Sequence, residues 1–260
     1  MLEPAQKKII PYGVLEPVPK KNTEAQELSS VIRQALRETT MPSVEVLAQD
    51  FLDVLAVDAG LKPTAVIGFG YPMNNALDRI ITLAPMLGMA TSMSHPWQAS
   101  CDSEDLPSWY VETLARLYAS TPIHIVSAIP ASLNALMTDG SPLSPEQESH
   151  SLAYPSCCVN EYHRRRHAYH LLTLDMLARQ VNGDELRMRR LVQSGVAMAP
   201  KDEAETTALL WATRTNFAPC TSIAMCGACA ADSDSPARRI SAQFRRLADR
   251  AGLLPFLSPI

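Results

Sequence analysis

Residues 235–252 read SPARRISAQFRRLADRAG, and this stretch gives the clearest indication of the fold class. Ser235 is suited to cap a helix N-terminus, Pro236 to fill its first position and Gly252 to follow its end. Apolar side chains recur along one face of such a helix, at Ile240, Phe244, Leu247 and Ala251. The spacing therefore predicts an amphipathic helix over residues 236–251.

The opposite face of this predicted helix carries five arginines, namely Arg238, Arg239, Arg245, Arg246 and Arg250. The net charge of the whole chain is −4, but the two ends differ. Residues 1–159 hold nine basic and 17 acidic side chains, whereas residues 160–260 hold 14 basic and 10 acidic ones. The arginine face predicts an anionic partner, either nucleic acid or an acidic protein surface. A surface helix kept soluble by its arginines is the alternative interpretation.

The rest of the chain shows the same helical spacing of apolar residues. It predicts helices near residues 23–36, 43–59, 74–87, 106–119, 161–180, 185–194 and 202–215. The short apolar run 65–69 is predicted as a strand, and the run 123–129 as either a buried strand or a turn of helix. The chain has only 10 glycines and is rich in alanine and leucine, which favours helices over a sandwich or barrel. We therefore expect a mainly α fold: a helical domain with one or two short strands and a C-terminal cysteine-rich metal module. An α/β fold is the alternative.

Composition limits the class of protein. With 47% hydrophobic and 19% charged residues, the chain is not expected to be disordered, and no apolar run is long enough for a membrane span. No signal peptide is apparent, so we expect a cytoplasmic protein. Residues 138–155 are rich in Ser, Pro, Gly and Glu and predict a long loop or boundary. It would separate an acidic, mainly helical part (1–150) from an Arg-rich helical part with the cysteine cluster (151–260).

Five of the six cysteines are candidate metal ligands: Cys157, Cys158, Cys220, Cys226 and Cys229. The last three form C-x5-C-x2-C, and tetrahedral zinc or an iron–sulfur cluster needs four ligands. Because neighbouring side chains usually point apart, we expect only one member of the Cys157-Cys158 pair to complete the set. A redox dithiol, a disulfide or inert buried thiols are the alternatives.

The tetrapeptide Cys226-Gly-Ala-Cys229 is similar to the C-G-x-C of the bacterial ferric-siderophore reductases. In that family a Cys-Cys pair and the C-G-x-C hold a [2Fe–2S] centre, and the pair stands shortly before the C-x-x-C. Here the similarity covers four residues, and Cys158 precedes Cys226 by 68 positions. The resemblance implies an iron–sulfur centre as the alternative to zinc.

Three functions follow as hypotheses. The first is an intracellular, cysteine-ligated zinc protein that acts as a binding or assembly module for nucleic acid or an acidic protein surface. The second is an iron–sulfur redox protein. The third is an enzyme with a pocket near Gly68–Tyr71 and His95, where a strand, a glycine turn and a helix follow one another. On the predicted helix 161–180, His163, His167 and His170 share a face and are either metal ligands or part of a packed surface.

Overall fold

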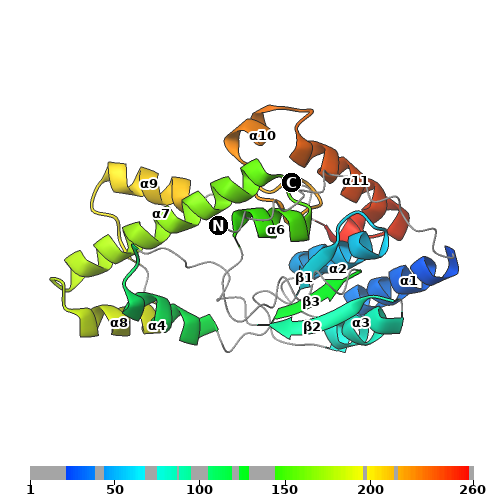
Figure 1. Ribbon diagram of the computed structural model, residues 1–260, viewed down its shortest axis with the longest axis horizontal. Helices are drawn as coiled ribbons and strands as arrows, with labels where there is room; N and C mark the ends of the chain where they lie inside the picture. The colour runs from blue at the N-terminus through cyan, green and yellow to red at the C-terminus, as the bar shows by residue number, and fades with distance from the viewer. Residues whose placement is uncertain are drawn as a thin grey trace, which may run out of the picture.

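The computed structural model describes residues 22–38, 44–67, 75–86, 88–94, 105–118, 123–128, 144–195, 198–213 and 216–257 (Figure 1). Most of these residues are helical. The helices are α1 Asn22–Glu38, α2 Val44–Asp58, α3 Asn75–Met86, α4 Ser108–Tyr118, α6 Pro145–Leu152, α7 Ser156–Gln180, α8 Glu185–Ser194, α9 Glu203–Thr213, α10 Gly227–Ala231 and α11 Pro236–Ala251, followed by a 3-10 turn at Leu254–Phe256. The expected mainly helical fold is confirmed.

A small sheet accompanies the helices. Its strands are β1 Thr64–Ile67, β2 Ala90–Ser94 and β3 Ile123–Ser127, in the order β1-β3-β2, with β3 antiparallel to both neighbours. The sequence predicts β1, and it predicts β3 as either a strand or a turn of helix. It does not predict β2, because the segment ATSMS has a single β-branched residue, Thr91, and no aromatic residue to indicate a strand.

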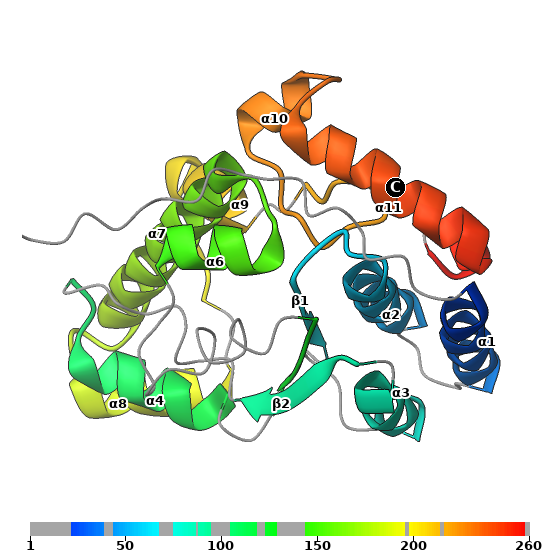
Figure 2. The ribbon, with the colours of Figure 1, turned by 45° about the vertical axis from the view of Figure 1, so that its right-hand side comes forward.

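The main hydrophobic core lies between the sheet and four helices. Helices α2 and α3 pack against the sheet, α1 packs on both of them, and α11 lies across α1 and α2 (Figure 2). Helix α2 is buried almost all round, including Phe51, Leu52 and Val54 at 0% exposure. Since Phe244 and Ala248 of α11 belong to the same core, the C-terminal helix is anchored by ordinary apolar packing.

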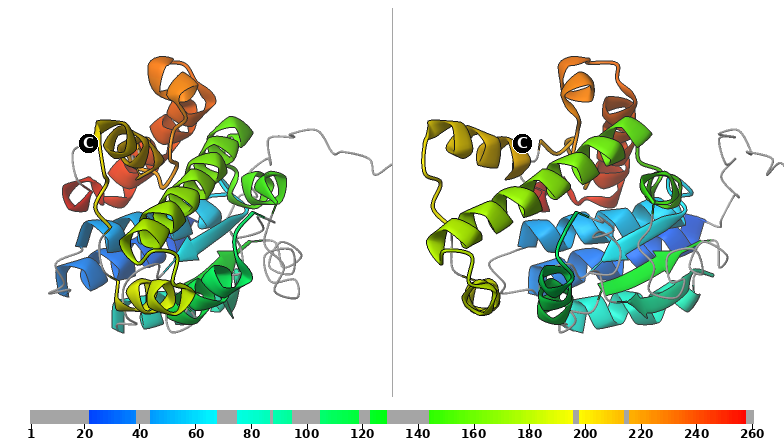
Figure 3. Two further views of the ribbon diagram at one scale, coloured as in Figure 1. Left: turned by 90° about the vertical axis from the view of Figure 1, so that its left-hand side faces the viewer. Right: turned by 60° about the vertical axis from the view of Figure 1, so that its left-hand side comes forward.

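A second apolar cluster holds α4 against α7 and α8. Helix α7 extends away from the main core, with α9 along its side and with α4 and α8 near its far end (Figure 3). Trp109, Tyr110 and Leu114 of α4 pack with Leu177 of α7, and Leu191 of α8 covers them. The cysteine-bearing start of α7 lies at the opposite end of this helix.

Two elements in the central segment differ from the sequence prediction. Part of the expected loop is helix α6, which begins with a capping box between Ser144 and Gln147. Helix α7 begins at Ser156, so the Cys157-Cys158 pair lies in its first turn and not in a loop. The backbone N–H of Cys158 already donates to the carbonyl of Pro155, at 2.9 Å. Among the described residues, no helix combines the length and the apolar composition needed to cross a lipid bilayer.

Candidate metal centre

Four cysteines from two distant segments meet at the start of α7. The Sγ atoms of Cys157, Cys158, Cys226 and Cys229 all lie within 4.8 Å of one another. Cys157 Sγ is 3.6 Å from Cys229 Sγ, and Cys158 Sγ is 3.9 Å from Cys226 Sγ. Each of these contacts joins one cysteine of α7 to one from the α10 segment. Four thiols at this separation could hold a metal ion or cluster.

The helical start of α7 explains why both members of the pair enter this group. Adjacent residues on an α-helix are about 100° apart around the axis, whereas on a strand they point to opposite faces. Cys158 is buried and Cys157 is exposed, so the pair lies at the edge of the centre that faces solvent. The Cys157-Cys158 pair therefore contributes two sulfurs from a single turn.

The second pair is positioned by a short hairpin-like loop and by α10. The backbone pairs Ala218 with Ile223 and Asn216 with Met225, which brings the chain back to Cys226 at the N-cap of α10. There the N–H of Cys229 donates to Cys226 Sγ, and the N–H of Cys226 donates to Cys158 Sγ, both at 3.5 Å. Such N–H donors stabilise thiolates and tune a bound metal.

Cys220 lies outside the four-sulfur group. It occupies the tip of the same loop, in a turn closed by the N–H of Thr221 and the carbonyl of Ala218. Pro219 occupies the second position of this turn, and Cys220 has a φ of +58°, as is usual at the third position of a type II turn. The turn directs Cys220 against the main core, where burial raises its pKa. Closeness in sequence to Cys226 thus does not bring its sulfur to the centre.

The thiols differ in how readily they ionise. Burial raises the pKa of Cys157 to about 11 and raises the pKa of Cys158 as well. Burial also opposes ionisation of Cys226, but hydrogen bonds from the Cys229 N–H and neighbouring thiols outweigh it and lower the pKa of Cys226. Of Cys157, Cys158 and Cys226, Cys226 therefore ionises most readily, and a metal that binds the thiolates would displace the remaining protons.

The five arginines of the predicted partner face all lie on α11. Arg239, Arg245, Arg246 and Arg250 are exposed, and Arg239 contacts Asp234 at 3.4 Å. Arg238 is half-buried, and its guanidinium donates to the carbonyl of Ala230 at the end of α10. Four cations therefore face solvent on the helix that follows the cysteine segment.

The three histidines of α7 each contact a different partner. His163 Nε2 lies 2.6 Å from Glu148 of α6, and His167 Nε2 lies 3.6 Å from Asp105 before α4. His170 is buried against Tyr110 of α4. The shared face thus packs α7 onto neighbouring elements. The candidate pocket at Gly68–Tyr71, His95 and the sixth cysteine, Cys101, lie outside the described residues.

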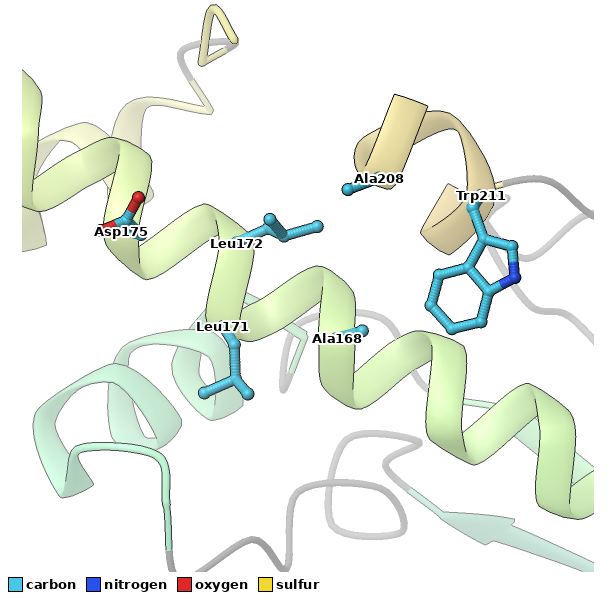
Figure 4. A pocket seen from close by; sticks show the side chains of 6 residues that line it. All are labelled: Ala168, Leu171, Leu172, Asp175, Ala208 and Trp211. Atoms are coloured by element: carbon cyan, nitrogen blue, oxygen red, sulfur yellow. The ribbon is translucent and has the colours of Figure 1, made fainter. Parts of the chain in front are cut away.

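An open pocket of about 420 Å³ lies between α7 and α9 (Figure 4). Its walls are apolar, with Ala168 and Leu172 of α7 facing Ala208 and Trp211 of α9. The guanidinium of Arg164 lies 4.7 Å from the centre of the Trp211 ring. The pocket contains no cluster of catalytic side chains.

Sequence reasoning missed a buried polar group beneath the centre, formed by Asp53, Lys62, Tyr154 and Ser222. The available signal was a carboxylate inside the apolar run FLDVLAV of α2, with a lysine soon after it. Asp53 is only 3% exposed.

Comparison with known proteins adds no assignment. No protein-family model matches the chain, and no curated protein or solved structure shows a significant match to it.

Proposed function

We propose that this protein is a one-electron redox protein whose [2Fe–2S] cluster is held by Cys157, Cys158, Cys226 and Cys229. One observation carries the proposal: a Cys-Cys pair and a C-G-x-C meet in space, although Cys158 and Cys226 are 68 positions apart. This is the combination of ligands that the resemblance to the ferric-siderophore reductases implies. Each of two irons needs two thiolates, and each of the two segments supplies two of the four cysteines.

The packing of α11 supports a redox role over a purely structural one. Structural zinc sites contribute most where the apolar core is too small to hold the fold. Here Phe244, Ala248 and Ala251 already anchor α11 in the main core, which includes α1 and α2. A metal is not needed to attach this helix, so the centre is free to serve another purpose.

The chemistry of such a centre is the transfer of single electrons between a donor and an acceptor. The exposure of Cys157 places the ligand shell at the protein surface, within reach of a docked partner. The N–H donors to Cys158 and Cys226 would raise the reduction potential by offsetting the negative charge on sulfur. Free thiols persist in a reducing compartment, so we place the protein inside the cell.

A second candidate is a zinc protein that binds nucleic acid or an acidic protein surface. The separation of all four Sγ atoms, at most 4.8 Å, favours it. A single tetrahedral zinc with Zn–S bonds of about 2.3 Å would place its sulfurs about 3.8 Å apart. The exposed arginines of α11 would then form the binding face.

Elemental analysis of the full chain purified without oxygen separates the two candidates. The redox proposal expects about two irons and two sulfides per chain, visible absorbance, and an electron paramagnetic resonance signal that appears after one-electron reduction. Colourless protein that carries one zinc per chain and no sulfide would reject it and support the zinc candidate. Protein that contains neither metal, and that takes up neither after reconstitution, would reject both.

A further inference from the structure

A closed ring of hydrogen bonds lies beneath the cysteine centre. Lys62 Nζ lies 3.4 Å from Tyr154 Oη and 3.4 Å from Asp53 Oδ2, and its side chain is 1% exposed. Ser222 Oγ lies 2.9 Å from the same carboxylate oxygen and also contacts Tyr154 Oη. Asp53 and Lys62 come from α2 and the loop after it, whereas Tyr154 and Ser222 come from the C-terminal half.

The direction of each hydrogen bond in the ring follows from the chemistry. Ser222 has one hydroxyl proton and donates it to Asp53, so Tyr154 must donate to Ser222 Oγ. Lys62 donates to Tyr154 and to Asp53, which closes the ring. Lys62 thus donates in both directions and Asp53 accepts from both, so Lys62, Tyr154 and Ser222 form one chain of donors in which each hydrogen bond polarises and strengthens the next.

Two members of the ring stand immediately before the two cysteine pairs. Tyr154 precedes Cys157 by three residues, and Ser222 precedes Cys226 by four. Tyr154 also packs against the apolar cluster that contains Cys158, Cys226 and Cys229. The contact between Tyr154 and Ser222 therefore joins the two segments on which the ligands lie. Along the chain, these two segments are separated by most of α7 and by α8 and α9.

We propose that Tyr154 and Ser222 are positioning residues that hold the two cysteine pairs in the ligating arrangement, anchored by the buried ion pair of Asp53 and Lys62. The inference rests on the four-cysteine site of the proposed function and applies to either metal. Neither residue is among the four candidate ligands, so each acts only through the segment that carries a cysteine pair. Removing either hydroxyl leaves all four cysteines in the chain. It should, however, allow the two segments to move apart, which weakens metal binding.

The competing explanation is that the ring only stabilises the fold, and the structure offers a matched control for it. Tyr154 is half-buried and Tyr110 is buried, and each has a hydrogen-bonded hydroxyl; that of Tyr110 lies 3.0 Å from His170 Nδ1, in the α4–α7–α8 cluster. Tyr110→Phe and Tyr154→Phe each remove one hydrogen-bonded hydroxyl. Only the second change lies between the cysteine segments.

Cobalt(II) binding to the metal-free full chain tests the inference. Cobalt reports thiolate ligation by its absorbance and does not require that the native metal be known. We expect Tyr154→Phe and Ser222→Ala each to weaken cobalt binding by about 10-fold to 100-fold, the range typical of residues that orient metal ligands. The double variant should be no weaker than the worse single variant, because both remove the same contact. Tyr110→Phe should bind cobalt as the wild type does.

The outcomes separate this inference from the proposed function. Wild-type affinity in Tyr154→Phe and Ser222→Ala, or an equal loss in Tyr110→Phe, would overturn the positioning role. If the purified protein carries zinc and no iron, while the two variants still lose cobalt, the redox proposal fails and the positioning role stands. If the wild type binds no cobalt and also takes up neither iron nor zinc, the cysteine site itself is refuted and both proposals fail.

Discussion

The hydroxyl of Tyr110 on α4 lies 3.0 Å from Nδ1 of His170 on α7, and both side chains are buried. Burial lowers the pKa of His170 to about 4, with the positive charge of Arg166 as a further cause. The imidazole is therefore neutral at physiological pH. This contact links a helix from the first half of the chain to the long helix that begins at the cysteine centre.

His170 predicts a loss of stability in mild acid. Its pKa is lower in the folded chain than the unfolded value of about 6.5, so the unfolded chain binds the extra proton first. The free energy of unfolding should fall as pH drops from about 6.5 to 4, with a slope of up to about 1.4 kcal/mol per pH unit from this group. Urea unfolding of the wild type and of His170→Gln across this range measures the difference. Identical pH slopes in the two proteins would contradict the prediction.

The cysteines predict a sharp division among serine variants. Cys157→Ser, Cys158→Ser, Cys226→Ser and Cys229→Ser should each lose most of the bound metal, because each removes one thiolate of the four-sulfur group. Cys220→Ser is the control and should keep its metal, since this thiol packs against the main core. Metal content per chain after gel filtration gives the answer. Full metal content in Cys157→Ser or Cys158→Ser would show that only one of the pair ligates.

The buried ion pair predicts a large cost for removing one partner. Lys62→Met leaves Asp53 charged and buried without its cation, and should lower the free energy of unfolding by about 3–5 kcal/mol. The double variant Lys62→Met/Asp53→Leu should recover part of this loss, because no lone charge remains. Chemical denaturation measures both. Lys201→Met, at an exposed lysine, should change stability by less than about 0.5 kcal/mol. A double variant less stable than Lys62→Met would contradict the expectation.

The α11 face predicts a salt-dependent interaction if the zinc candidate is correct. We expect the wild type to bind a short DNA duplex with an affinity that falls steeply as salt rises. Replacing Arg239, Arg245, Arg246 and Arg250 by glutamine should abolish most of this binding, and each lost phosphate contact should reduce the salt slope by about 0.9. Fluorescence anisotropy at several salt concentrations measures the slope. Arg187→Gln/Arg190→Gln on α8 is the control, and an equal effect there would argue against a specific face.

The sequence predicts the features that depend only on neighbouring residues, such as helix caps and tight turns. The cap at Ser235, the proline after it and the glycine at the end of α11 are all where the sequence indicated. The same holds for the C-x-x-C turn, whose ligand geometry is set within four residues. Strand β2 was missed because its residues have no strand-like pattern of their own, and it forms by pairing with β3.

The composition of the centre depends on tertiary contacts that spacing does not reveal. Cys220 is six residues from Cys226 and was expected as a ligand, but the turn at Pro219 sends it to the core. Neighbouring side chains point to opposite faces on a strand, whereas the helical backbone at Cys157 and Cys158 turns them only about 100° apart. The ring under the centre joins residues up to 169 positions apart, and no sequence pattern indicates such a pairing.

The long segment between the two cysteine pairs makes metal affinity insensitive to changes in the length of that segment. Closing a chain on itself costs configurational entropy that grows only with the logarithm of loop length, about 0.6 kcal/mol for each doubling. The segment from Cys158 to Cys226 is already long and internally folded into α7, α8 and α9. Its outer end could therefore be shortened, extended or exchanged with little effect on metal affinity. The length and sequence of the segment between the two cysteine pairs can therefore change while the four ligands stay in place.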